Sequence, residues 1–426
     1  MSQPRIAYVG MTHLGICSAI AAASKGFETI CFDPDTARIT ALDAGKLPVV
    51  EPDLDELLAS NRARIIFTAD VAALAKADVI YVAPDVPTDD AGSSDLAPIK
   101  SLLALIEPAL AKDSVTVILS QVPPGFSRVH AFAGRPFYYQ VETLVFGRAV
   151  ERATLPERFI IGCADPKAPL PQSFKTFLDA FGCPLLPMRY ESAELAKISI
   201  NCCLVASVTV ANTLAELCEH IGAEWTEIAP ALKLDKRIGA FSYLAAGLGL
   251  SGGNLERDLA TVENFARDHG SDASLIEAFI HNSKHRKDWP LRTLHKALLD
   301  DKPDAVIGVL GLAYKENTHS TKNSPSLALL RHLHPWAVRL FDPVVPAIAA
   351  EHPRSTACAS ALDVAKGVDA LIVMTPWPAF CKLAAADIKA AMRGRLVIDP
   401  YRMLDGAALT KAGLTHITLG VGAPQA

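Results

Sequence analysis

The sequence lacks any run of basic residues long enough to bind a polyanion. Its 426 residues carry a formal net charge of only −5, with 41 Lys and Arg against 46 Asp and Glu. Nucleic acids and anionic membranes are bound largely through clustered Lys and Arg, so this composition argues against either as a main partner. The short Lys-His-Arg-Lys stretch at residues 284–287 is expected to be a solvated helix face.

The nine cysteines lack the spacing of a metal site, since no Cys-x-x-Cys pair occurs. We therefore expect reduced thiols, no metal and a cytoplasmic protein. No secretory signal is expected before the first predicted strand at residues 5–9. The most apolar helical segment, residues 195–217, contains Lys197, Asn201 and Asn212, which argues against a membrane span.

The N-terminal segment follows the plan of a dinucleotide-binding fold. A strand leads into a turn with Gly10 and Gly15, then a helix at 16–25 and a strand at 28–32 that ends in Asp33. Thr12 stands where the usual motif has its middle glycine, so the glycines alone are a weak signal. The acid strengthens it, because Asp33 suits a ribose hydroxyl and repels a 2′-phosphate, which favours NAD over NADP. The alternative is that Asp33 only begins the Asp-Pro-Asp turn.

Further strands are predicted at 79–83, 115–119, 159–162 and 184–187, separated by helical segments. Half of the residues are hydrophobic, and the length predicts two to three domains. Alternating strands and helices predict a mostly parallel sheet that binds ligands at the carboxyl ends of its strands. The loops at 84–95 and 120–126, which contain Pro and Gly, are therefore expected to face the cofactor.

A long apolar helix is predicted over residues 192–220. Lys197, Asn201 and Asn212 lie on one face of it, and we favour a polar site there over structural capping. Residues 247–258 contain a cluster of glycines, which is expected where the backbone turns sharply or closely approaches a ligand.

The strand plan repeats near the C-terminus. A strand at 305–309 and a strand at 337–341 that ends in Asp342-Pro match the first unit, as do the segments 75–84 and 365–376. We predict an α/β fold with two Rossmann-like parallel-sheet domains, joined by a long central helix and a helical middle domain. The second turn, at Gly311, lacks the Gly10/Gly15 pattern, so it is expected to bind something other than a dinucleotide. Lys315, Lys322 and Arg402 are available there for phosphate.

These motifs together resemble the UDP-glucose/GDP-mannose dehydrogenase family over nearly the whole chain. The matching segments follow in order: Gly10, Gly15 and Asp33; residues 45–52 as Gly-x-x-Pro-x-x-Glu-Pro; Asp95-Leu96; Glu194, Lys197, Asn201 and Asn212; residues 235–258; Tyr314, Lys315, Thr318 and Ser324-Pro325; Thr375-Pro-Trp377; and Asp399-Pro-Tyr-Arg402.

The resemblance implies a homodimer built through the central helix and an enzyme of polysaccharide biosynthesis that uses NAD on a nucleotide sugar. It divides the chain into an NAD-binding domain (1–190), a central helical domain (191–298) and a nucleotide-sugar domain (299–426). The implied residues fall into three sets. The catalytic set is Lys197, Asn201, Asp258, Asn254 and Glu142. The cofactor set is Gly10, Thr12, Leu14, Gly15, Asp33, Arg38, Pro84, Gln121 and Lys322. The substrate set is Phe146, Arg237, Tyr243, Gly249, Gly252, Tyr314, Lys315 and Arg402.

The sequence departs from the family where the second half of its reaction takes place. The family oxidises the C6 alcohol twice and passes through a thioester on a cysteine of a Gly-Gly-x-Cys-x-x-Lys-Asp motif. Aligned on Asp258, that cysteine is Asn254 here, the lysine is Arg257 and a proline is Glu256. Two further changes replace the family's water-positioning threonine with Gln121 and the second of its paired glutamates with Phe146.

An amide nitrogen is no nucleophile at neutral pH, so the sequence predicts an NAD-dependent enzyme that stops after one hydride transfer. Three alternatives stay open. One is a complete four-electron dehydrogenase that uses Cys202 or Cys203. Another is a nucleotide-sugar epimerase with bound NAD, and the third is a catalytically silent relative that only binds a nucleotide sugar.

Overall fold

The computed structural model describes residues 3–87, 89 and 94–422. The chain divides into two compact units, residues 1–200 and 201–426. Each unit contains its own parallel or mostly parallel sheet, which confirms the predicted α/β class with two Rossmann-like domains and a helical middle.

The first unit is built on an eight-stranded sheet with the order β3-β2-β1-β4-β5-β6-β7-β8. Its neighbouring strands are parallel except for β6 and β7, which run antiparallel. The strands are β1 (Ile6–Val9), β2 (Thr29–Phe32), β3 (Ile65–Thr68), β4 (Val79–Val82), β5 (Val115–Ile118), β6 (Phe137–Gln140), β7 (Phe159–Cys163) and β8 (Leu185–Arg189). β3 and β6 are not among the strands that the sequence predicts.

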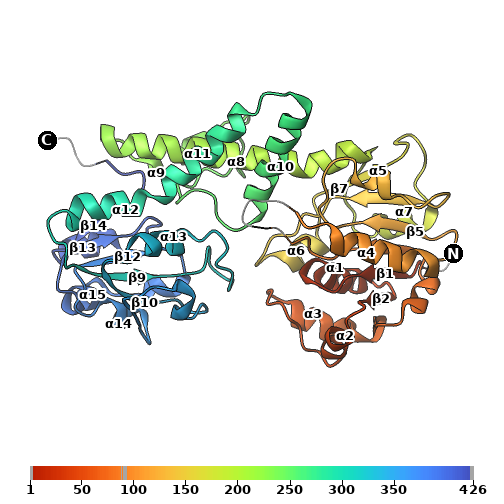
Figure 1. Cartoon of the computed structure of the whole chain (residues 1–426), viewed down its shortest axis with the longest axis horizontal. Helices are drawn as coiled ribbons and strands as arrows, with labels where there is room; N and C mark the ends of the chain where they lie inside the picture. Colours follow the sequence, from red (N-terminus) through yellow and green to blue (C-terminus); the bar gives the residue numbers. More distant parts are fainter. Residues whose placement is uncertain (1–2, 88, 90–93, 423–426) are drawn as a thin grey trace. The chain divides into compact units, whose positions relative to one another are not determined.

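Helices cover both faces of this sheet, so its central strands are apolar on both sides (Figure 1). In β4, Val79 and Tyr81 join the core under α1, while Ile80 and Val82 join the core under α4. The helices are α1 (His13–Ser24), α2 (Thr36–Asp43), α3 (Leu54–Asn61), α4 (Ala97–Ile106), α5 (Phe126–His130), α6 (Ala149–Thr154) and α7 (Gln172–Asp179).

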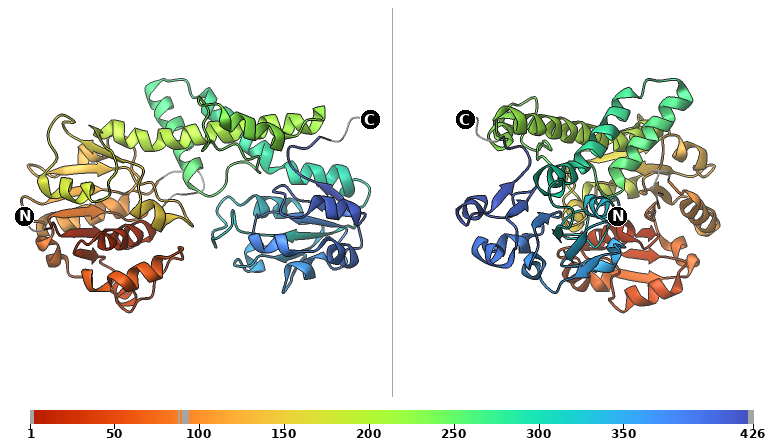
Figure 2. Two further views of the ribbon diagram at one scale, coloured as in Figure 1. Left: turned by 180° about the vertical axis from the view of Figure 1, so that it is seen from behind. Right: turned by 60° about the vertical axis from the view of Figure 1, so that its left-hand side comes forward.

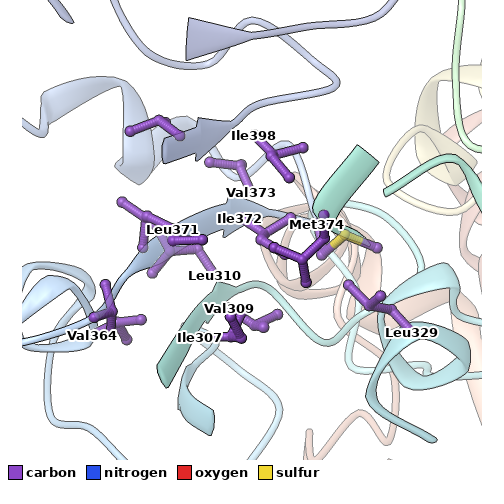
Figure 3. Packing of buried hydrophobic residues seen from close by; sticks show 14 of the residues in the cluster. Ile307, Val309, Leu310, Leu329, Val364, Leu371, Ile372, Val373, Met374 and Ile398 are labelled. Carbon is purple, nitrogen blue, oxygen red and sulfur yellow. The ribbon is translucent and has the colours of Figure 1, made fainter. Parts of the chain in front are cut away.

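The second unit contains a six-stranded, all-parallel sheet with the order β11-β10-β9-β12-β13-β14. Its strands are β9 (Val306–Leu310), β10 (Ala337–Phe341), β11 (Ser355–Ala357), β12 (Ala370–Val373), β13 (Leu396–Ile398) and β14 (Thr415–Ile417). Figure 3 shows the aliphatic packing on its central strands, with Leu329 and Val364 contributed by helices beside the sheet. Its helices are α13 (Pro325–His332), α14 (Ala361–Ala365), α15 (Ala385–Ala391) and α16 (Gly406–Lys411).

One long helix, α8 (Tyr190–Ile221), begins in the first unit and continues into the second (Figures 1 and 2). By length and composition alone, α8 would suffice to cross a membrane. The core helices of globular proteins also pass that test, and a third of its most apolar window is buried. The absence of a membrane span stays a prediction. The remaining helices are α9 (Trp225–Leu234), α10 (Asn254–His269), α11 (Ser274–Lys287) and α12 (Trp289–Leu294).

The basic stretch at 284–287 is only partly solvated, which corrects the expectation of a solvated face: Lys284 and His285 are exposed, but Arg286 is buried and Lys287 is partly buried. Arg286 has no exposed surface and lies 3.1 Å from a carboxylate oxygen of Glu216 and 3.7 Å from one of Glu219, both on α8. Lys287 donates to Glu256 of α10 at 2.9 Å. These acids lie far from the stretch in sequence, so only the packing of α11 against its neighbours reveals the ion pairs.

Candidate active site

The turn after β1 has the shape of a dinucleotide cradle. Gly10 has φ +91°, and a Cβ there would lie 2.8 Å from the nitrogen of Pro84. A Cβ on Gly15 would lie 2.0 Å from the carbonyl oxygen of Gly10, so neither glycine tolerates a side chain. Thr12 needs no glycine conformation, and its hydroxyl accepts a hydrogen bond from the Asp85 N–H at 2.7 Å. The two glycines thus let the turn, the start of α1 and the loop at Pro84 pack closely together, and Thr12 fixes the neighbouring loop.

Asp33 lies at the end of β2 and is almost fully buried. Its carboxylate accepts hydrogen bonds from the Met11 N–H at 2.7 Å, the Asp35 N–H at 2.9 Å and the Arg38 guanidinium at 2.8 Å. The positive charge of Arg38 is paired with Asp33 and with Asp35, so Arg38 is not an uncompensated cation for a 2′-phosphate. The electrostatics therefore fit NAD better than NADP.

The loops that follow β4 and β5 are joined to each other. The Ser120 hydroxyl donates to the carbonyl of Pro84 at 2.5 Å. Gln121 follows Ser120 directly in the same loop. The later part of this loop is fixed by Glu194 of α8, whose carboxylate accepts hydrogen bonds from the backbone N–H groups of Gly125 and Ser127. Burial raises the pKa of Glu194 despite these bonds. Residues 88 and 90–93 of the predicted 84–95 loop lie outside the described part of the chain.

Lys197 and Glu142 form a largely buried ion pair with 2.7 Å between Nζ and Oε1. The other oxygen of Glu142 accepts the Leu144 N–H at 2.9 Å, which fixes the carboxylate at the end of β6. A cavity of about 50 Å³ adjoins Glu142, with Tyr8, Ser18, Gln140 and Arg152 among its lining residues. Its mixed lining and its volume suit a few water molecules.

Glu51 is buried and has several hydrogen-bond partners, although the sequence indicates it only as one residue of the motif at 45–52. It accepts the Gly147 N–H at 3.0 Å and the Ala149 N–H at 3.1 Å, and it pairs with His13 at 2.8 Å. The His13 ring stacks on Phe146 with 4.3 Å between centroids. Glu51 therefore connects the cofactor turn to the segment that begins at Glu142. The sequence signal that could have identified Glu51 is an acidic residue placed between apolar residues and a proline.

Asn201 lies one turn after Lys197 on α8 and is hydrogen-bonded to Asp258, with 2.5 Å between Nδ2 and Oδ2. Asp258 is 1% exposed, and its other oxygen lies 3.4 Å from Nε of Arg257. Asn212, further along the same face, supports the chain backbone by accepting the Gly247 N–H at 2.8 Å. This bond assigns Asn212 a structural role, in contrast to the predicted ligand site.

The glycine loop, residues 247–253, presents Asn254 as the exposed first residue of α10. Gly249 has φ +75°, and a Cβ there would lie 2.4 Å from the carbonyl oxygen of Ser283. The Leu250 N–H donates to the Ser283 hydroxyl at 2.8 Å, and the Leu250 side chain is buried between helices. The close approach of Gly249 is thus to the backbone and side chain of Ser283 on α11.

The other predicted residues are more scattered. Leu14 is buried in the core under α1, and Tyr243 is half-exposed. The Arg237 side chain is exposed and paired with Asp235. Lys315 lies 5.7 Å from the Tyr314 ring, whose pKa is raised to about 12 by burial and by Glu316. Arg402 has φ +55° and is bonded to Glu224 at 2.8 Å and to Thr226 at 3.2 Å.

Comparison with known proteins places these elements in one family. Three descriptions of the UDP-glucose/GDP-mannose dehydrogenase family match: the NAD binding domain at residues 4–175, the central domain at 191–284 and the UDP binding domain at 308–406. The chain is 30% identical to the UDP-glucose 6-dehydrogenase of Pseudomonas aeruginosa, with 99% of this chain and 98% of that protein covered.

Solved structures agree with this. A UDP-glucose dehydrogenase from Pyrobaculum islandicum matches with a TM-score of 0.82 at 25% identity, covering 96% of this chain and 98% of its own. A UDP-D-ManNAc dehydrogenase from Pyrococcus horikoshii shares the fold with a TM-score of 0.84 at 22% identity, and the match covers 98% of this chain and 99% of that chain. The chain therefore belongs to the UDP-glucose/GDP-mannose dehydrogenase family and is an NAD-dependent nucleotide-sugar dehydrogenase.

Proposed function

We propose that this enzyme oxidises a UDP-sugar by two electrons and releases a carbonyl product. The observation that carries the proposal is Asn254, an exposed amide at the start of α10 in the position where the family motif has its cysteine. A thioester needs a sulfur nucleophile, and the lone pair of an amide nitrogen is delocalised. The second oxidation consequently has no covalent intermediate at this position.

The retained residues suffice for the first oxidation. The alcohol loses a hydride to NAD, which supplies the electron acceptor, and loses its hydroxyl proton to a base. The Lys197–Glu142 pair places a carboxylate beside an ammonium, which suits proton acceptance directly or through water together with stabilisation of the developing carbonyl oxygen. Asp258 fixes the orientation of the Asn201 amide, one turn further along α8, which leaves the amide oxygen of Asn201 as an acceptor for a substrate hydroxyl.

The two cysteines nearest these residues in sequence do not suit a displaced nucleophile. Burial, followed by the charge of Asp258 and by Cys203, raises the pKa of Cys202 to about 11, so its thiolate is scarce at neutral pH. Cys203 is exposed, but it lies roughly 200° around α8 from Asn201, on the opposite face. Both observations support a single oxidation over a four-electron reaction.

The residue roles, the three-domain division at 190 and 298, and the homodimer belong to the same proposal. Val210, Leu214, Leu217 and Ile221 are each at least 40% exposed and recur every three or four residues, which forms an apolar row along α8. Such a row supports pairing of α8 with its copy in a second subunit.

The test counts NADH per sugar consumed in a panel of UDP-, GDP- and dTDP-sugars, with the carbonyl product trapped by a hydrazine. We expect one NADH per sugar and a hydrazone with a UDP-sugar. Two NADH per sugar would refute the proposal. No NADH with a changed sugar would identify an epimerase, and binding alone would identify a silent relative.

Asn254→Cys is the matched variant, because it restores a thiol at the start of α10. We expect it to raise the yield to two NADH per sugar and to give an acid product. Asn254→Ser, which has a small hydroxyl in the same place, is the control and is expected to stay at one NADH or fewer. An unchanged product from the Cys variant would show that the loop does not present residue 254 to the sugar.

A further inference from the structure

We propose that Asn323 and Glu256 are positioning residues, which link the glycine loop to the loop that follows β9. That loop, residues 311–324, is called the β9–α13 loop. The inference rests on the proposed function only for the role of Asn254. It adds that a nucleoside diphosphate bound by the second sheet controls where Asn254 is presented.

Both polar groups of Gly252 are bound by the β9–α13 loop. The Gly252 N–H donates to the carbonyl oxygen of Lys322 at 3.1 Å, and the Asn323 side-chain amide donates to the carbonyl oxygen of Gly252 at 2.9 Å. Gly252 lies two residues before Asn254. A displacement of residues 322–323 is therefore transmitted to Asn254 through only two intervening peptide units.

Close packing strengthens this connection. Gly252 has φ +83°, and a Cβ there would lie 3.1 Å from the Tyr314 ring, so the ring sits directly against the glycine. A Cβ on Gly253 would lie 3.4 Å from the side-chain methylenes of Lys322. The Tyr314 N–H donates to the carbonyl oxygen of Ser320 at 3.0 Å, which closes the β9–α13 loop on itself. The two loops are consequently packed against each other as one assembly.

Glu256 provides a second attachment that the family's proline lacks. Its carboxylate accepts from the Asn323 side-chain amide and, at its other oxygen, from Lys287 at 2.9 Å. Asn323 adopts φ +51°, a left-handed conformation that asparagine tolerates better than most residues. One amide group thus bonds both the glycine loop and the first turn of α10, on the two sides of Asn254.

The β9–α13 loop lies within residues 308–406, which match the UDP binding domain of the family. A nucleoside diphosphate that fixes this loop favours one position of Gly252, and therefore of Asn254. Because coupling between two sites is reciprocal, the position of the glycine loop also changes affinity for the nucleotide. This coupling positions the glycine loop, and with it Asn254, only when the nucleotide part of the substrate is bound.

The experiment uses the thiol introduced by Asn254→Cys in the full-length protein as a position reporter. Iodoacetamide alkylation of that residue is followed by peptide mass spectrometry, which separates it from the nine native cysteines. We expect UDP to change its alkylation rate by about fivefold or more, the usual lower range of site-to-site coupling. Adding Asn323→Ala is expected to reduce this change to less than about twofold while UDP still binds.

Asn282→Ala is the matched control, because its amide also makes a long-range hydrogen bond in the second unit, to Thr213 at 3.0 Å. It is expected to leave the UDP effect intact. Glu256→Ala keeps the inference testable if Asn323→Ala does not fold, and it is expected to weaken the UDP effect partially.

No UDP effect in the parent variant, or an undiminished effect in the Asn323 variant, would overturn the inference. Equal loss in the Asn282 control would overturn it as well, since the effect would then be a general loosening. Alkylation requires no turnover, so failure here is distinguishable from an NADH count of two, which would overturn only the proposed function.

Discussion

Removing the charge of Glu51 is expected to destabilise the first unit strongly. The carboxylate has no donor of its own and receives three: His13 and the Gly147 N–H at one oxygen, and the Ala149 N–H at the other. In Glu51→Gln one of the two carboxylate oxygens is replaced by an NH₂ group, which then faces an N–H donor instead of accepting from it. At least one buried donor then loses its acceptor, and each such loss costs about 1–3 kcal/mol.

With the weakened His13 contact included, we expect the free energy of unfolding to fall by about 2–4 kcal/mol. In a unit of this size, that corresponds to a melting temperature lower by about 4–16 °C. Thermal denaturation followed by circular dichroism measures the shift. Glu56→Gln, which removes the same charge from the exposed face of α3, is the control and is expected to change the unfolding free energy by less than about 0.5 kcal/mol.

A Glu51→Gln protein that melts within about 2 °C of the Glu56→Gln control would refute this reasoning. Such a result would show that the segment from Glu142 to Ala149 does not depend on the Glu51 carboxylate. The link between the cofactor turn and the Lys197–Glu142 pair would then have to run elsewhere.

Two further predictions concern buried carboxylates in each unit. Asp33→Asn is expected to weaken NAD binding by about tenfold or more, because a charged acceptor is lost. It is also expected to reduce the ratio of NAD affinity to NADP affinity, and calorimetric titration with both cofactors measures the two affinities. A ratio that stays constant would contradict the role of the Asp33 charge. Burial alone would raise the pKa of Asp369, but hydrogen bonds from Arg393, Lys302 and the Val306 N–H outweigh it and lower the pKa far below its usual value. The stability from this depressed pKa is present above about pH 4 and is lost as the pH falls below it. Urea unfolding should therefore show Asp369→Asn less stable than the wild type at pH 7, with a gap that shrinks below pH 4; a gap constant from pH 7 to pH 3 would disprove the assignment.

The sequence predicted the elements whose signal is local. Apolar strands that end in Asp33-Pro and Asp342-Pro predicted both sheets. The apolar composition of residues 192–220 predicted α8 to within two residues at its N-terminal end and one residue at its C-terminal end. β3 and β6 were missed because Ile65–Thr68 has only one buried residue and Phe137–Gln140 follows a loop with no clear helix before it. Local pattern is a weak guide to such short strands.

The site was harder to predict wherever a side chain is held by a distant segment. Asn212 and Lys197 look alike in sequence, as polar residues on one face of an apolar helix. One binds the backbone of the glycine loop, and the other binds a carboxylate. Arg286 looked solvated because its acidic partners lie on α8, far earlier in the chain. Partners of this kind are set by packing, which no local spacing encodes.

The two sheets share one turn geometry after their first strands. Gly311 repeats Gly10: it has φ +96°, its N–H donates to the end of the neighbouring strand, and a Cβ would collide with Thr375. Asp342 repeats Asp33 by accepting the backbone N–H that follows the glycine.

The difference between the two turns lies in where the next helix begins. α1 begins at His13, three residues after Gly10, so its unpaired N-terminal N–H groups lie beside the first turn, an arrangement that suits an anion such as a pyrophosphate. α13 begins at Pro325, fourteen residues after Gly311, so no helix start meets the second turn. The residues between β9 and α13 form the β9–α13 loop, which holds Gly252 through Lys322 and Asn323. The second turn therefore differs from the first because a long loop, which fixes the glycine loop, stands where the first turn has a helix start.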